Sequence, residues 1–195
     1  MTDYRGSKVF TARGLRNNNP FNLQKTAIKW QGKIPGNDSR FETFDSVENG
    51  IRAGVIDVVG DIAKDGDNTL NKLFKRFAPE FENDTAAYIK YVGGVTGKTA
   101  DEVLNPGGKI DRIFLYKLAT AIIEKENGKE QAKNVPAEVI KNGVDLALKS
   151  SAISKYIQQS QTPTGSKSGT LKDYSGLIIL AIMFILFFKF FIQLK

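Results

Sequence analysis

The sequence predicts a mainly α-helical domain with one small β-hairpin, followed by a linker and a single C-terminal transmembrane helix. Three observations predict this architecture. Residues 13–40 are rich in Asn, Gly, Pro and Lys and show little helical periodicity. Between residues 45 and 156, hydrophobic side chains recur at the spacing of helices with one buried face. Residues 176–188 carry no polar side chain.

The N-terminal part of the domain is predicted to form loops and the short hairpin. Phe21 and Trp30 are its aromatic landmarks, and Phe41 and Phe44 bracket a brief extended stretch that follows. Asn, Gly and Pro favour turns because they accept or impose the backbone angles that turns need. This region is therefore expected to supply the only β-structure of the domain.

The rest of the domain is predicted to be helical. Asp45 and Ser46 are both good N-caps for the first long helix, and Asp45 with Glu48 matches a capping box. This helix should stop at residues 65–67. Further helices are expected from about residue 69 to before Pro79, from 83 or 84 to the pair Gly93 and Gly94, at 101–104, at 110–126 and at 136–156.

The C-terminal part of the chain is predicted to anchor the protein in a membrane. Residues 174–194 form a 21-residue window, close to the ~20 residues that cross a bilayer as a helix. Its hydrophobic side chains lie on every helical face, unlike those of a core helix or an in-plane helix. We therefore expect a domain at 1–159, with motifs at 13–92 and a helical extension at 93–159, a flexible linker at 160–173 and an anchor at 174–195.

The ends of the chain add two expectations about targeting. Residues 1–20 contain no hydrophobic stretch long enough for the core of a secretory signal peptide. Tyr174 and Lys189 are placed for the two membrane interfaces. Lysines flank both sides of the hydrophobic segment, so the positive-inside rule does not orient it.

The composition excludes several kinds of chemistry. The 195 residues include no Cys and no His, which removes zinc sites built from these ligands, Ser-His-Asp triads, Cys-His nucleophiles and disulfides. Catalysis would have to use carboxylates, Tyr, Lys, Ser, Thr or backbone amides. No cofactor and no metal are expected.

Basic charge is concentrated near the N-terminus. The net charge is +7, and residues 1–40 hold eight Lys or Arg against two Asp, a net +6. Such a surface suits anionic polymers, among them peptidoglycan, lipid headgroups and DNA. A DNA-binding protein would show regularly spaced basic residues on a helix or a known motif, and we find neither. No specific nucleic-acid binding is expected.

Four separated patterns occur in order along the chain. They are RGLRNNNPFNL at 13–23, WQG at 30–32, RFETFDSVENGIRAG at 40–54 and FAPEFENDTAAYIKYV at 77–92. Together they resemble phage virion proteins of the lytic-transglycosylase-like type, and less closely the autolysin and flagellar glucosaminidases. The resemblance implies a lysozyme-like fold with a small β-hairpin lobe and cleavage of the glycan strands of peptidoglycan. Glycan cleavage requires only carboxylates, which agrees with the composition.

The chain departs from these families in the position of the acid. Their catalytic Glu lies at the end of a helix before the Asn-containing loop, whereas here only Asp3 precedes Asn17. The essential acid is therefore supplied from elsewhere or missing. Acidic candidates that follow the loop are Asp38, Glu42, Glu48, Glu82 and Asp84.

Glu48 is the first candidate for proton donation, because it lies where the hairpin meets the first long helix. Its alternative role is to cap that helix. Glu42, on the extended stretch, would face the cleft or solvent, and Asp38 would be a second carboxylate of the hairpin lobe or a turn residue. Glu82 and Asp84 are expected to cap the third helix.

Four residues are candidates for binding the sugar. Asn19 and Asn22, in the Asn-containing loop, would bond N-acetyl groups or form an ordinary turn. Trp30 would stack on a sugar ring or fill the small lobe. Tyr88 matches the Tyr that the autolysin pattern places beside the acid, and its alternative is a core or surface position.

The combined prediction is a membrane-anchored enzyme that cleaves peptidoglycan glycan strands, as a lytic transglycosylase, muramidase or glucosaminidase. Its expected place is the virion membrane of a phage, where it would digest the cell wall locally during entry. Expected partners are peptidoglycan, the lipid membrane and other virion proteins. The alternative is a catalytically inactive structural or peptidoglycan-binding virion membrane protein.

Overall fold

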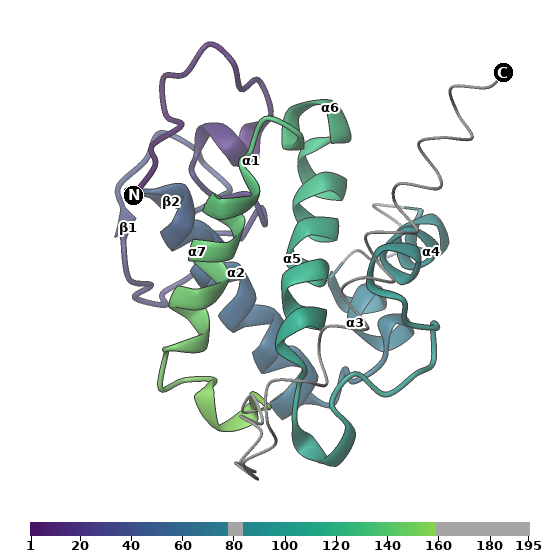
Figure 1. The fold of residues 1–195 in the computed structure, drawn as a ribbon. Helices are drawn as coiled ribbons and strands as arrows, with labels where there is room; N and C mark the ends of the chain where they lie inside the picture. The colour runs from purple at the N-terminus through teal and green to yellow at the C-terminus, as the bar shows by residue number, and fades with distance from the viewer. Residues whose placement is uncertain (78–83, 159–195) are drawn as a thin grey trace, which may run out of the picture. The chain divides into compact units, whose positions relative to one another are not determined.

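The computed structural model describes residues 1–77 and 84–158 of the chain (Figure 1). The described part is mainly helical and contains one two-stranded antiparallel sheet, which confirms the predicted fold class at this level. The linker and membrane anchor predicted at 160–195 lie outside the described residues. Within the described ranges, no helix is long and hydrophobic enough to cross a membrane.

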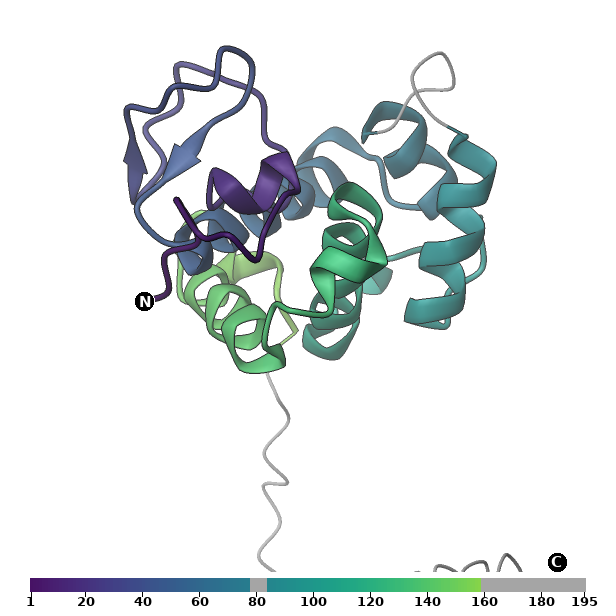
Figure 2. The same ribbon diagram turned by 90° about the horizontal axis from the view of Figure 1, so that it is seen from above.

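The N-terminal lobe consists of loops, one helical turn and the hairpin. Helix α1 spans Arg13–Arg16, strand β1 spans Lys33–Ile34 and strand β2 spans Thr43–Phe44, with Lys33 opposite Phe44. The turn at α1 was not predicted because a single turn leaves no helical periodicity in the sequence. Figure 2 shows this lobe on one side of the described part, with α3 and α4 on the other.

Helix α2 spans Val47–Gly60 and continues as the π-helical segment η1, Asp61–Asp65. Its N-cap is Ser46, whose side chain accepts a hydrogen bond from the backbone N–H of Asn49. The capping box predicted from Asp45 does not form, because the carboxylate of Glu48 bonds another part of the chain, described below. Gly66, at φ 81°, ends the helix within the predicted stop at 65–67.

Helices α3 and α4 form the next pair. Helix α3 spans Leu70–Phe77 and α4 spans Thr85–Thr96, where Asp84 is the N-cap predicted for it and accepts from the N–H of Ala87 at 2.9 Å. The predicted stop at Gly93 and Gly94 is wrong. The helix continues to Gly97, whose φ of 76° is the left-handed conformation that ends helices.

Helix α5 spans Arg112–Asn127 and is followed by α6, Lys129–Ala132, and α7, Ala137–Leu148. Asp111 caps α5 by accepting from the N–H of Phe114. The helix predicted at 136–156 therefore ends earlier, and a separate 3-10 turn, η3, covers Ser154–Tyr156. The short helix predicted at 101–104 is absent. A 3-10 turn, η2, at Pro106–Gly108 takes its place.

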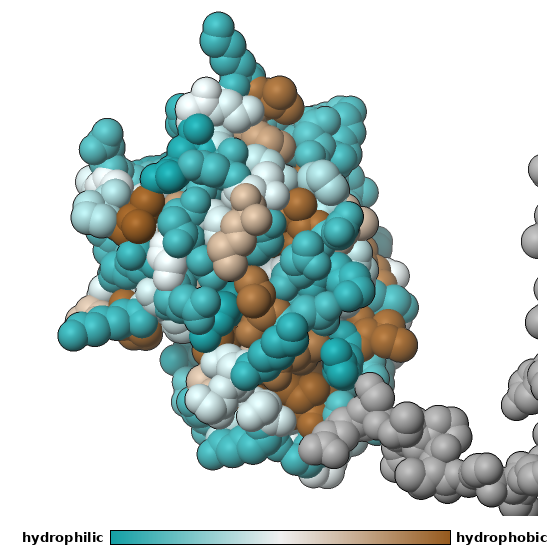
Figure 3. All heavy atoms as spheres, turned by 60° about the vertical axis from the view of Figure 1, so that its left-hand side comes forward, coloured by the Kyte–Doolittle hydropathy of each residue, from teal (hydrophilic) through white to brown (hydrophobic). Residues whose placement is uncertain are grey.

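The core lies between α2, α5 and α7. Helix α7 approaches α2 closely at Gly143, where an added Cβ would come within 2.6 Å of the Ile51 side chain. On another part of α2, the Phe21 ring lies against Gly54, at 2.2 Å from the position of an added Cβ. On the face shown in Figure 3, hydrophobic side chains gather along the lower middle, and hydrophilic side chains cover most of the rest. The contact at Gly143 thus joins α7 to α2, and the contact at Gly54 joins the N-terminal lobe to α2.

Candidate functional site

A cleft of about 420 Å³ opens where the N-terminal lobe meets α2 and α5. Hydrophobic and aromatic side chains make up much of its wall, and Arg40, Asp57 and Glu126 are its charged lining residues. The other lining residues are Phe21, Asn22, Leu23, Gln24, Thr26, Ile28, Trp30 and Phe41. The cleft thus combines aromatic and aliphatic side chains with a mostly polar exposed lining, and convergent polar groups fix the orientation of a bound ligand.

Glu126 lies at the C-terminal end of α5 with its carboxylate at this cleft. Its Oε1 accepts from the Tyr88 hydroxyl at 3.0 Å, and its Oε2 accepts from the Asn22 side-chain amide at 2.9 Å. Leu118 and Ile122 are buried on the same face of α5, eight and four residues before it. The packing of this face therefore holds the Glu126 carboxylate next to the loop at Asn22, which lies 104 residues earlier in the chain.

The Asn-containing loop is fixed against the end of α5. Asn22 has a φ of 52°, a left-handed conformation that Asn tolerates better than most residues. One residue after Glu126, the Asn127 side-chain amide donates to the backbone oxygen of Pro20 at 2.8 Å. The loop and the acid are thus held together by both side-chain and backbone contacts.

Tyr88 is buried, with 3% of its surface exposed, and its ring stacks on that of Phe74 at 4.6 Å between centroids. Burial raises the pKa of the Tyr88 hydroxyl, and the charge of Glu126 and the hydrogen bond to it raise the pKa further. The hydroxyl therefore stays protonated and donates to the carboxylate. The structure thus brings the predicted Tyr88 next to an acid.

The other predicted sugar-binding residues are divided between the cleft and the interior. Trp30 is half-buried and lines the cleft, as Asn22 does. Asn19 is fully buried, and its amide donates to the backbone oxygens of Leu23 and Glu42 at 2.9 and 3.0 Å. Its amide oxygen accepts from the N–H of Leu23. Asn19 therefore holds the loop in shape and does not reach the cleft.

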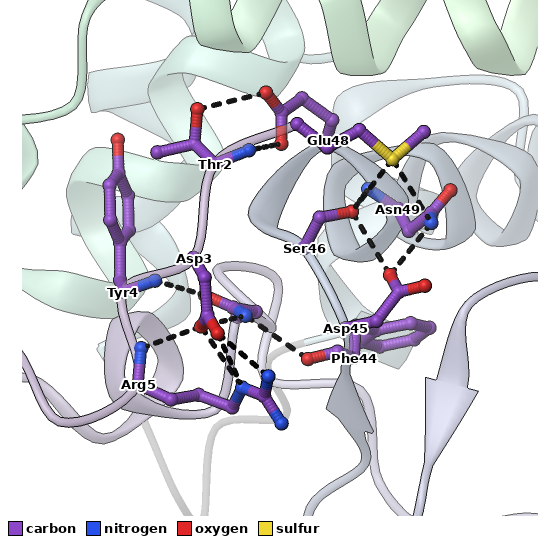
Figure 4. Close-up of polar contacts among 11 residues, drawn as sticks. Thr2, Asp3, Tyr4, Arg5, Phe44, Asp45, Ser46, Glu48 and Asn49 are labelled. Atoms are coloured by element: carbon purple, nitrogen blue, oxygen red, sulfur yellow. Dashed lines mark hydrogen bonds and ion pairs between the residues drawn. The ribbon is translucent and has the colours of Figure 1, made fainter.

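Glu48 lies away from the cleft, against the N-terminal segment (Figure 4). Its Oε2 accepts from the backbone N–H of Thr2 at 2.7 Å, and its Oε1 accepts from the Thr2 hydroxyl at 3.0 Å. The residue is only 4% exposed. The backbone of Val47 also donates to that of Thr2. Both oxygens of Glu48 thus fasten the N-terminal segment to the start of α2.

Glu42 is buried inside the hairpin lobe, although its strand position suggested a cleft-facing or solvent-facing side chain. It is 1% exposed and forms an ion pair with Lys33 at 2.7 Å. Its Oε1 also accepts from the backbone N–H of Thr26 at 2.9 Å. Removing either partner of such a buried pair would leave an uncompensated charge in the lobe. Glu42 is not among the residues that line the cleft.

Asp38 holds the tip of the hairpin against α1. Arg13 donates two hydrogen bonds to its carboxylate, both at 2.7 Å, and the Asn17 amide donates a third. The Arg13 guanidinium, together with the backbone N–H groups of Phe41 and Arg40 and the Asn17 amide, holds the pKa of Asp38 well below its ordinary value. Asp38 is therefore an ionised structural acceptor outside the cleft.

Two further predictions concern the acids near α4. Asp84 caps this helix, as expected, and Glu82 lies outside the described residues. Among residues 1–77 and 84–158, no group of three or more His, Cys, Asp or Glu is arranged to hold a metal ion.

Sequence reasoning missed Glu126 because it lies at the end of a predicted helix and follows the Asn-containing loop. In the related patterns the acid precedes that loop. The local signal was present, since the sequence Glu126-Asn127-Gly128 places a carboxylate in the last turn of a helix that ends at Gly128. A search for a helix-terminal Glu anywhere in the chain would have found it.

Comparison with known proteins gives one informative relative. No protein-family model matches the chain. The chain is 36% identical over 121 residues to protein P5 of Pseudoalteromonas phage PM2, a match that covers 60% of this chain and 72% of that protein. A phage protein is thus similar to more than half of this chain. The chain belongs to the family of protein P5 of phage PM2.

Proposed function

We propose that this protein cleaves the glycan strands of peptidoglycan, with Glu126 as the proton donor. The observation that carries the proposal is the position of this carboxylate at a cleft, where Tyr88 and Asn22 each donate a hydrogen bond to it. An acid held on both oxygens has a defined orientation toward a bound sugar. Cleavage of a glycosidic bond needs such an acid beside the leaving oxygen.

The contacts of Glu126 also account for the acid that the sequence motifs lack. In the transglycosylase and autolysin patterns a helix-terminal Glu precedes the Asn-containing loop. Here a helix-terminal Glu contacts the Asn-containing loop in space but follows it in the chain. We infer that the acid and the loop are arranged as in a lysozyme-like site, but that they occur in the opposite order along the chain. In this arrangement the acid is supplied from elsewhere in the chain and is not missing.

The chemical step follows from the cleft residues. Glu126 gives its proton to the glycosidic oxygen as the bond from the anomeric carbon to that oxygen breaks. Tyr88 and Asn22 position the carboxyl group, and the ring of Trp30 provides a surface on which a sugar ring stacks. Basic residues of the N-terminal lobe attract the carboxylates of the peptide stems.

The proposed setting is the virion of a membrane-containing phage. The relative is a phage protein, and the hydrophobic segment at 176–188 favours attachment to a membrane. In this setting the enzyme would act locally on the cell wall during entry. Peptidoglycan, the virion membrane and other virion proteins are the proposed partners.

The proposal is tested with the purified full chain in detergent, by measuring soluble fragments released from isolated cell walls. We expect Glu126→Gln to lower turnover by about 10²- to 10⁴-fold, the contribution typical of a general acid. Glu124→Gln is the matched control, because Glu124 lies two residues earlier on α5 and accepts from Tyr91 instead. It should retain wild-type turnover.

Two results would count against the proposal. Equal turnover by the wild-type protein and Glu126→Gln would show that this carboxylate is not the proton donor. Binding of the wild-type protein to insoluble peptidoglycan without release of fragments would instead select the structural or peptidoglycan-binding alternative.

A further inference from the structure

A second carboxylate lines the same cleft. Asp57 lies on α2 and Glu126 on α5. We propose that Asp57 is the general base that activates a water molecule against the anomeric carbon, so that the reaction is hydrolysis and leaves a free reducing end. This inference rests on the proposed function, because it assigns the second catalytic group of that site.

The helices that carry the two carboxylates are packed together beneath the cleft. Phe21, Val58 of α2, and Leu118 and Ile122 of α5 surround a space there that is too small for a water molecule. One turn before Asp57, the Phe21 ring lies against Gly54, where only a residue without a Cβ fits. The two acids therefore project from a rigid base, and rigid elements hold catalytic groups more accurately than loops do.

Asp57 differs from the carboxylates that the sequence singled out. Asp38, Glu42 and Glu48 each accept several hydrogen bonds from protein groups. In contrast, none of the side-chain hydrogen bonds or ion pairs found among residues 1–77 and 84–158 involves the Asp57 carboxylate, which lines the cleft. Its oxygens are therefore open to a water molecule in the cleft, as a general base requires.

The charges around Asp57 suit this role. Burial raises its pKa, the charge of Arg76 lowers the pKa and the charge of Asp65 raises it. Arg76, on α3, also forms ion pairs with Asp65 at 2.9 Å and with Asp61 at 3.7 Å. Arg76 thus favours the ionised form, while burial makes that form a stronger base than an exposed carboxylate.

The proton balance of the step is complete with these groups. The water oxygen bonds to the anomeric carbon, and Asp57 takes one proton of that water. The bond from the anomeric carbon to the glycosidic oxygen breaks, and the oxygen takes the proton of Glu126. Exchange with solvent then restores both carboxyl groups. If no water is activated, the sugar's own hydroxyl attacks the anomeric carbon and passes its proton to the ionised Glu126 carboxylate, which leaves an anhydro end.

The test begins with the wild-type full chain, digesting cell walls in water labelled with ¹⁸O. Mass spectrometry should find one heavy oxygen at each new reducing end. A wild-type enzyme that forms anhydro ends alone would overturn the role of Asp57, whether or not any variant folds. It would leave the role of Glu126 intact.

Variants then address the residue itself. Asp57→Asn should lower turnover about a hundredfold and shift the remaining products toward anhydro ends, a change that a merely structural role would not cause. In Asp57→Ala, added azide should raise the rate and yield a glycosyl azide. Asp61→Asn is the control, since it removes a neighbouring acid that does not line the cleft, and it should keep the wild-type product.

The outcomes separate the two proposals. Suppose that Asp57→Asn keeps wild-type turnover and labelled products, while Glu126→Gln is inactive. This result would overturn the role of Asp57 as the general base and leave the role of Glu126 as the acid. Full activity of Glu126→Gln would overturn the proposed function itself.

Discussion

Replacing Glu48 with Gln should destabilise the protein and leave turnover unchanged. The buried carboxylate accepts from the backbone N–H of Thr2 at 2.7 Å and from its hydroxyl at 3.0 Å. Gln keeps one acceptor oxygen for the backbone N–H of Thr2, and its amide nitrogen can donate to the Thr2 hydroxyl. Both hydrogen bonds then join neutral groups and lose the contribution of the carboxylate charge.

The size of this effect follows from the contacts. A hydrogen bond to a charged group contributes about 1.5–3 kcal/mol and one between neutral groups about 0.5–1.5 kcal/mol, so each of the two bonds is weakened by roughly 1–1.5 kcal/mol. We therefore expect a loss of about 2–3 kcal/mol in the free energy of unfolding. For a chain of this length each kcal/mol corresponds to about 2–4 °C in Tm, so Tm should fall by about 4–12 °C.

Thermal unfolding of the full chain in detergent measures the stability, and fragment release at 25 °C measures turnover. Thr2→Val is a companion variant, because it removes only the hydroxyl bond to the same carboxylate and should cost about 1.5–3 kcal/mol with no change in turnover. A Glu48→Gln protein with an unchanged Tm and no turnover would refute this reasoning, since it would place Glu48 in the chemistry and not in the attachment of the N-terminal segment.

Three further changes test the site and the lobe. Tyr88→Phe removes one donor to Glu126 and should lower turnover about ten- to a hundredfold, by the roughly 1.5–3 kcal/mol of such a bond; unchanged fragment release would contradict this. Gly14→Ala places a Cβ 2.6 Å from the Asn22 amide oxygen, so both Tm and turnover should fall, at a cost of about 1–3 kcal/mol for overpacking; a wild-type Tm would refute the close contact. Folding depresses the pKa of Asp38 below its ordinary 3.8, so its stabilisation is present above pH 3.8 and is lost as the pH falls below it. Tm measured from pH 2 to 7 should therefore fall less steeply in Asp38→Asn than in wild type on the acid side.

Much of the fold could be predicted because helices are marked locally. Asp84 caps α4 and Gly66 ends the helix that begins at α2, both at positions that the sequence indicated. Errors arose where a local signal was overridden. Gly93 and Gly94 resemble a stop, yet the helix continues to Gly97, because glycine can remain helical when the flanking turns are packed.

The candidate site was predictable only in part. Tyr88, Trp30 and Asn22 were identified from motifs, and the structure places all three at or beside the cleft. Glu48, a leading carboxylate, lies elsewhere because its partner is Thr2, 46 residues away in the chain. No pattern around Glu48 reveals such a distant contact.

The sequence by itself determined the elements and the chemistry that is possible. Helical periodicity and capping residues are local properties, and a chain without Cys or His leaves carboxylates as the main acids and bases. Only the tertiary structure decided which carboxylates line the cleft. Asp38, Glu42 and Glu48 are held by donors from distant segments, whereas the packing of α5 on α2 brings Glu126 and Asp57 to one cleft. Burial and hydrogen bonding depend on such distant contacts, so they separate acids that look alike in the sequence.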